Sequence, residues 1–345
     1  MRPAPPLYKA PDRTYVIDTC RPQLRAIREG RIDFHALSHG HYPGTLLDRD
    51  VLRGISTIGY WDAVGEQDWG LEAHRNEGVE VVLLETGGMP FVVDGRRHDL
   101  RAGDLTITRP WQLHRLGDPH IGPGRIHWFV LDVGVRRPDQ PWRWPPWVSL
   151  IREDREELTA RLRQNERPVW PSTPEIRHDF QALAEAIRQN RGRSHVSTIV
   201  VHLNHLLLNL LTLLRRQRVP RDPGLTTRER TVELFLEDLK ASPASLAHPW
   251  TLPEMASLCG LGVTTFVKYC RRRTNASPLA YLARCRLERA ARRLREEPGT
   301  SITAIALDCG FSSSQHFASR FRECFGCSPT AFRGRDRRPG RAPAP

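Results

Sequence analysis

Two short segments in the last third of the chain place hydrogen-bonding side chains beside arginines. Amides, hydroxyls and ammonium groups can bond the edges of DNA bases, whereas guanidinium groups suit phosphate oxygens. Lys268 suits guanine acceptors, Gln315 can bond an adenine edge in two places, and Thr264 or Val267 can meet a thymine methyl group. The candidates for base contacts are Thr264, Val267, Lys268, Ser314, Gln315, His316 and Ser319. The candidates for phosphate contacts are Thr265, Arg271, Arg272, Arg273, Arg320 and Arg322.

A second set of candidates lies in the first half of the chain: His74, Glu80, Trp111 and His114. A metal site of the kind that histidines and one carboxylate build needs about three histidines converging on one ion, and this set falls short. A pocket for a small-molecule effector is the better interpretation. We therefore expect an effector site here, with no metal and no cofactor.

The candidates for base and phosphate contacts lie within an internal repeat. The segment Leu252 to Leu261 aligns with Ile302 to Phe311, so that alanine, cysteine and glycine coincide. After one inserted residue, Phe266 falls on Phe317 and Ser277-Pro278 on Ser328-Pro329. One structural unit is therefore used twice.

Each copy has the pattern of a short helix, a sharp turn and a second helix. Gly260 and Gly310 suit the turn, where positive φ is needed. Between the copies, residues 279–294 form an amphipathic pattern rich in arginine, which predicts a long helix that holds the copies apart. Two such units can enter successive major grooves about 34 Å apart.

The rest of the chain divides by pattern. Residues 1–30 are rich in proline and arginine and predict an irregular arm, and residues 31–137 contain many short strands, with a hairpin turn at Asp94-Gly95. Residues 138–149 form a Pro/Trp connector, and residues 150–218 predict helices whose leucines follow a heptad. A linker at 219–228, the DNA-binding segment 229–336 and a disordered tail at 337–345 complete the division.

Charge and cysteine usage agree with this division. The net charge is +13, and residues 225–345 hold 20 Lys and Arg against 11 Asp and Glu. A basic segment attracts polyanions whatever their sequence.

Seven cysteines without a secretory signal indicate reduced thiols and a cytoplasmic protein. The apolar run from 199 to 214 contains His and Asn residues, so we expect no membrane span.

The repeat resembles the signature of the AraC/XylS family. The resemblance rests on Leu287 to Ala290, Ser301 to Phe311, His316-Phe317 and Phe325 to Pro329, and covers about residues 230–335. It implies that the seven candidates for base contacts above are base-reading positions. Cys270, Cys309 and Asn275 depart from the family's usual residues. The strand-rich region resembles the cupin-like sensor domain of the same family through Gly103 to His114, although Arg75 and Asn76 follow His74 where a further histidine is usual.

These observations predict an α+β multidomain chain. A cupin-like β-barrel with a helical dimerisation segment precedes an all-α domain with two helix-turn-helix motifs. The expected partners are double-stranded DNA, an unknown small-molecule effector and a second copy of the chain, while contact with RNA polymerase remains open. No motif of the common catalytic classes is present, so we expect no enzyme. The alternatives are a metal-dependent cupin enzyme fused to a DNA-binding module and an architectural DNA-binding protein without a ligand.

Overall fold

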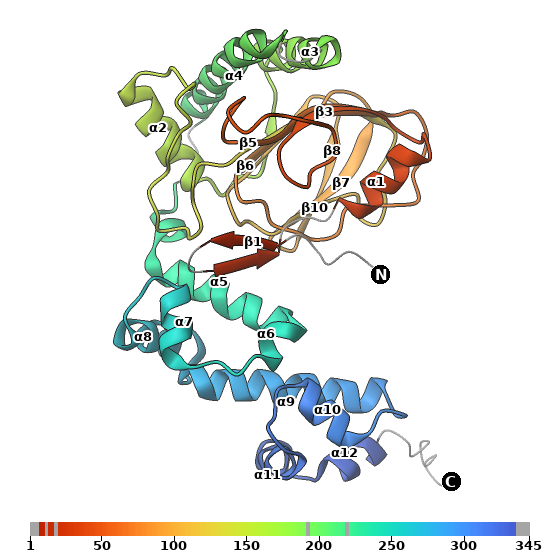
Figure 1. Ribbon diagram of the computed structural model, residues 1–345, viewed down its shortest axis with the longest axis vertical. Helices are drawn as coiled ribbons and strands as arrows, with labels where there is room; N and C mark the ends of the chain where they lie inside the picture. The colour runs from red at the N-terminus through yellow and green to blue at the C-terminus, as the bar shows by residue number, and fades with distance from the viewer. Residues whose placement is uncertain (1–6, 11–12, 17–19, 191–193, 218–220, 336–345) are drawn as a thin grey trace, which may run out of the picture. The chain divides into compact units, whose positions relative to one another are not determined.

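The computed structural model describes residues 7–10, 13–16, 20–190, 194–217 and 221–335 (Figure 1). By its contacts the chain divides into two compact units, Met1–Thr227 and Arg228–Pro345. The predicted tail at 337–345 lies outside the described residues, as do parts of the predicted arm and linker.

The first unit is built from strands in three sheets. A seven-stranded sheet has the order β12-β9-β6-β11-β5-β3-β4, a three-stranded sheet has the order β10-β7-β8, and β1 pairs with β2. The strands are β1 (Leu7–Ala10), β2 (Arg13–Val16), β3 (Asp33–Ser38), β4 (Thr45–Leu46), β5 (Ile55–Ala63), β6 (Val79–Leu84), β7 (Gly88–Val93), β8 (Arg96–Arg101), β9 (Asp104–Thr108), β10 (His114–Leu116), β11 (Gly124–Leu131) and β12 (Val169–Pro171).

The large sheet is buried on both faces. One face packs against the small sheet, where Trp61, Val82 and Trp128 meet Phe91 and Leu100. The other face packs against the helices α2 (Arg152–Arg163), α3 (Pro174–Gln189) and α4 (Val196–Arg216). Figure 1 shows α3 and α4 side by side over this face. The hairpin predicted at Asp94-Gly95 is confirmed, because β7 and β8 pair around two residues with positive φ.

Helix α4 is longer than the apolar run suggested, with 21 residues. By length and composition it could cross a membrane. Its leucines from Leu203 to Leu214 are buried except Leu208, and they pack against α3 and the large sheet. The heptad predicts a helix buried either in a bundle or in a dimer seam, and these leucines pack inside the first unit.

The prediction of an irregular arm over residues 1–30 is wrong in part. The described residues of this segment include β1, β2 and a helix, α1 (Arg21–Arg28). Ala26 in α1 is fully buried against the barrel. The helix is short, at eight residues, and its three arginines Arg21, Arg25 and Arg28 are all exposed.

The second unit is all helical. After η1 (Pro223–Thr226) at the end of the first unit, it runs through the helices α5 (Arg228–Ala241), α6 (Pro243–Ala247), α7 (Leu252–Leu258), α8 (Val263–Thr274), α9 (Pro278–Glu296), α10 (Ile302–Asp308), α11 (Ser314–Phe325) and α12 (Pro329–Arg335). It has two apolar cores, one before and one after the middle of α9. The predicted fold class is confirmed: a β-rich domain is followed by a helical domain with two helix-turn-helix units.

Candidate nucleic-acid interface and ligand cavity

The first helix-turn-helix unit consists of α7 and α8. Thr251 and Glu254 form a capping box that fixes the start of α7. Gly260 makes the turn with φ of 63°, and Phe266 anchors α8 from its buried side. On the opposite side Thr264 and Lys268 are exposed, whereas Thr265 and Val267 are partly buried. The first unit thus presents a short polar face above a closed core.

The second unit, α10 and α11, repeats this arrangement. Gly310 makes the turn with φ of 85°, Ser313 caps α11 by accepting from the His316 backbone N–H, and Phe317 is fully buried. Of the four side chains predicted to contact bases here, Gln315, His316 and Ser319 are exposed and Ser314 is partly buried. The exposed set lies on the side of α11 away from its core.

Helix α9 contributes to both cores, so it links the two units. Its first half packs on α5, α6 and α8, and its second half packs on α10, α11 and α12. Figure 1 shows α8 and α11 both nearly end-on, which means that their axes run close to parallel. Parallel second helices on one support are suited to successive major grooves of one duplex.

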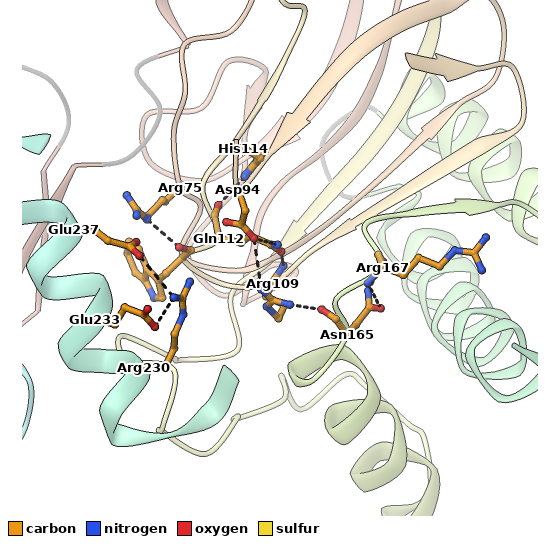
Figure 2. Close-up of polar contacts among 11 residues, drawn as sticks. Arg75, Asp94, Arg109, Gln112, His114, Asn165, Arg167, Arg230, Glu233 and Glu237 are labelled. Atoms are coloured by element: carbon orange, nitrogen blue, oxygen red, sulfur yellow. Dashed lines mark hydrogen bonds and ion pairs between the residues drawn. The ribbon is translucent and has the colours of Figure 1, made fainter. Parts of the chain in front are cut away.

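The arginines predicted to contact phosphates fall into two classes. Arg272 lies 3.3 Å from Glu229, Arg273 pairs with Glu233, and Arg320 lies 2.7 Å from Glu323. Arg271 and Arg322 are exposed. Glu233 also pairs with Arg230 at 2.7 Å, and Figure 2 shows Glu233 and Glu237 of α5 both directed at that arginine. Sequence reasoning missed these glutamates, because α5 lies outside the repeat.

The barrel brings three of the four effector candidates together. His74, Glu80 and His114 line a cavity of about 60 Å³ between the two sheets. The His74 and His114 rings lie 4.4 Å apart, and His114 Nε2 lies 2.7 Å from Glu80 Oε2. Further lining residues include Cys20, which precedes α1, Gln23 of α1, Tyr42, Asn76, Trp61 and Trp128.

Trp111, the fourth candidate, is not part of this lining. Its indole N–H donates to the Val135 carbonyl at 2.8 Å, and its ring belongs to the core on the helix-covered side. Arg75 donates to the Trp111 carbonyl at 3.0 Å. Gln112, the next residue, donates to Asp94 (Figure 2). The structure therefore places Trp111 in the core on the helix-covered side and outside the cavity lining.

Glu80 and His114 form an ion pair in the cavity lining. Burial by itself raises the pKa of Glu80, but the charge and hydrogen bond of His114 outweigh burial, so the pKa lies below the usual value. His114 Nδ1 lies 2.9 Å from the Gln112 carbonyl. The two ring nitrogens of His114 therefore lie near a carboxylate oxygen on one side and a backbone carbonyl oxygen on the other. Within the described part of the chain, no group of three or more His, Cys, Asp or Glu side chains is arranged to hold a metal ion.

Comparison with known proteins agrees with both halves of this description. Residues 255–335 match the family described as a helix-turn-helix domain, and residues 63–207 match the AraC-like ligand binding domain. The chain belongs to the AraC family of transcriptional regulators.

Relatives of this AraC-type regulator include two transcriptional activators. The activator RhaR of Mannheimia succiniciproducens is 24% identical over 262 residues, which cover 76% of this chain and 87% of the relative. The activator RhaS of Escherichia coli is 26% identical and covers 76% of this chain and 88% of the relative. A solved structure of a probable AraC family regulator from Rhodopseudomonas palustris is 33% identical, covers 32% of this chain and 98% of that chain, and has a TM-score of 0.28.

The AraC-type regulator thus combines an N-terminal ligand-binding domain with a C-terminal DNA-binding domain. The two family matches together span about two thirds of the chain, and they include β6 to β12, the last part of α7 and all of α8 to α12.

Proposed function

We propose that the regulator reads one duplex with α8 and α11 together, and that a small-molecule effector bound in the barrel controls this reading. The observation that carries the proposal is the repeated arrangement of the two units. Each second helix exposes polar side chains above a fully buried phenylalanine, Phe266 or Phe317. In this proposal the protein acts in the cytoplasm, has no catalytic role, and consists of a barrel (31–137), a helical segment (150–218) and a DNA-binding segment (229–336).

The base contacts are assigned to the exposed or partly exposed polar faces. In the first unit these are Thr264, Val267 and Lys268; in the second they are Ser314, Gln315, His316 and Ser319. Thr265, Arg271, Arg272, Arg273, Arg320 and Arg322 are assigned to phosphates, for which Arg272, Arg273 and Arg320 must leave or share their acidic partners.

The assignment of Gln315 is tested with duplexes that the wild-type chain selects from a random library. The substitution Gln315→Ala removes a bidentate donor and acceptor, so it should cost about 1 to 3 kcal/mol at one base pair and relax specificity there. Thr303→Ala, which changes an exposed residue of α10 outside the proposed contacts, is the matched control. An equal loss of affinity on every sequence would contradict the assignment.

For the effector, Glu80, His114 and His74 supply the polar end of the cavity. A screen of small polar metabolites should find a compound that raises the melting temperature of the full chain, since a ligand present at about 100 times its Kd stabilises a protein by about 2.7 kcal/mol. We expect Glu80→Gln to lose this shift and His120→Gln, on an exposed barrel loop, to keep it. If Glu80→Gln responds as the wild type does, the compound binds elsewhere.

We assign the contact with a second copy of the chain to the exposed side of α4. Val201 and Leu208 lie one heptad apart on this helix and are 64% and 39% exposed, so they form an apolar stripe beside the buried leucines. A dimer through this stripe would give twice the 39.5 kDa of the chain in sedimentation. A monomer at all concentrations, with and without DNA, would exclude it.

A further inference from the structure

The two cores of the DNA-binding unit are joined mainly by α9. The first half of this helix supplies Leu282 and Cys285 to one core, and the second half supplies Leu287 and Leu294 to the other. A shared helix fixes how far apart the two cores lie. The two halves of the unit could still rotate relative to each other about the axis of α9. Contacts made by side chains near the middle of α9 restrict this rotation.

Arg286 lies at this junction. Its Nε donates to the Leu246 carbonyl at 2.6 Å, and its Nη2 donates to the His248 carbonyl at 2.6 Å. These carbonyls lie at the C-terminal end of α6, where helical partners for carbonyl oxygens run out. Burial lowers the pKa of the Arg286 guanidinium, which means that its charge is partly withdrawn from water. The two carbonyls offset that loss of hydration with charge-assisted hydrogen bonds.

The same guanidinium meets the turn of the second helix-turn-helix unit. Gly310 has a positive φ, and a Cβ atom at this position would lie 2.9 Å from the guanidinium carbon of Arg286. It would lie equally close to the Cα of Ala247, at the end of α6. Only glycine lets the turn between α10 and α11 approach so closely. Arg286 is therefore in contact with the end of α6 in the first half and with the Gly310 turn in the second.

We propose that Arg286 is a positioning residue that fixes α11 relative to α8 and thereby sets the half-site separation that the regulator accepts. This inference rests on the proposed function, in which both helices bind one duplex. A guanidinium holds two carbonyls at once because its donors form a fixed planar fork. An ammonium group on the same helix carries the charge but cannot reproduce the fork.

The test uses the full chain and the duplexes that the wild type selects from a random library. Base pairs are inserted or deleted between the two half-sites, and each one shifts them by about 3.4 Å along the duplex. We expect the wild type to lose about tenfold or more in affinity when the spacing changes by one base pair. The spacing ratio is the affinity for the selected duplex divided by the affinity for a duplex whose spacing differs by one base pair. In Arg286→Lys, which keeps the net charge, we expect the spacing ratio to fall to about threefold or less.

Two further variants make the test specific. Arg292→Lys changes an exposed arginine on the same helix and should keep the wild-type ratio. Gly310→Ala pushes a methyl group into the Arg286 contact and should lower the ratio as Arg286→Lys does. Melting temperatures measured in parallel establish that each variant is folded.

The outcomes separate this inference from the proposed function. If Arg286→Lys binds more weakly at every spacing but keeps the wild-type ratio, Arg286 only supports the fold and the inference is overturned. The proposal that α8 and α11 bind one duplex together is not affected by that result. If the wild type binds duplexes of all spacings equally, the proposal that α8 and α11 bind one duplex together is wrong, and this inference is wrong with it.

Discussion

In the first half of the DNA-binding unit, α7 and α8 pack against two additional helices, whereas the second half has only α12 in that role. Val232, Phe235 and Leu239 of α5 and Leu246 of α6 complete the first core. The second core is instead filled by a cluster of phenylalanine rings: Phe311, Phe317, Phe321, Phe325 and Phe332. The same helix-turn-helix plan is therefore stabilised by added helices in one half and by large aromatic side chains in the other.

The two halves also differ in charge. The supporting helix α5 carries Glu229 and Glu233, which pair with Arg272 and Arg273 of α8. Among the described residues, α11 has no such acidic partner on another helix, and Arg320 pairs with Glu323 on its own helix. The helix that stabilises the first half therefore also neutralises part of the positive charge of that half. We therefore expect the halves to differ in how they unfold and in how they depend on salt.

The largest expected effect comes from removing a buried ring. Phe317→Ala leaves a cavity among rings at 5.1 and 5.3 Å and should destabilise the second half by about 3 to 5 kcal/mol. Amide hydrogen exchange should show α10 and α11 losing protection while α7 and α8 keep theirs. Phe266→Ala should give the converse pattern. If either variant unfolds both halves together, the two cores do not act as separate units.

A smaller effect concerns the salt dependence of DNA binding. Arg322→Ala should lower the slope of log affinity against log salt by about one, because an exposed arginine that contacts phosphate displaces one counterion. Arg273→Ala should lower the slope by less, since Glu233 already neutralises that arginine. Equal slopes for the two variants would show that the pairing with α5 does not persist on DNA.

The smallest effect is expected at the ends of the second helices. Both end in a left-handed residue, Asn275 after α8 with φ of 54° and Gly326 after α11 with φ of 70°. Asn275→Gly removes the strain of a side chain in this region and should stabilise the first half by about 0.5 to 1 kcal/mol. Gly326→Ala should destabilise the second half by about 1 kcal/mol. Urea unfolding measures both, and a destabilising Asn275→Gly would mean that the asparagine side chain contributes more than its strain costs.

Local spacing made much of this molecule predictable from its sequence. Gly260 and Gly310 are predicted at turns with positive φ and are found there, because this feature depends on residues within one helix-turn-helix unit. Phe266 and Phe317, which align in the repeat, both prove to be fully buried. Asn275, one of the residues that depart from the family's usual pattern, adopts the left-handed conformation with φ of 54°.

Contacts between distant segments were not predictable in the same way. The contribution of Cys20, and of Gln23 in α1, to the cavity lining depends on where the sheet places a helix of only eight residues. Trp111 lies three residues from His114 in sequence, yet its positive φ of 66° directs it to the opposite core. The pairing of Arg273 with α5 likewise depends on the packing of two helices far apart in the chain.

The central claim is that α8 and α11 read one duplex at the same time. Hydroxyl-radical and methylation footprints of the full chain on a selected duplex test it most directly. The account predicts two protected major-groove sites on one face of the duplex, about 10 to 10.5 base pairs apart, with the Gln315→Ala variant losing protection at only one of them. A single protected site, or two sites on opposite faces, would contradict it.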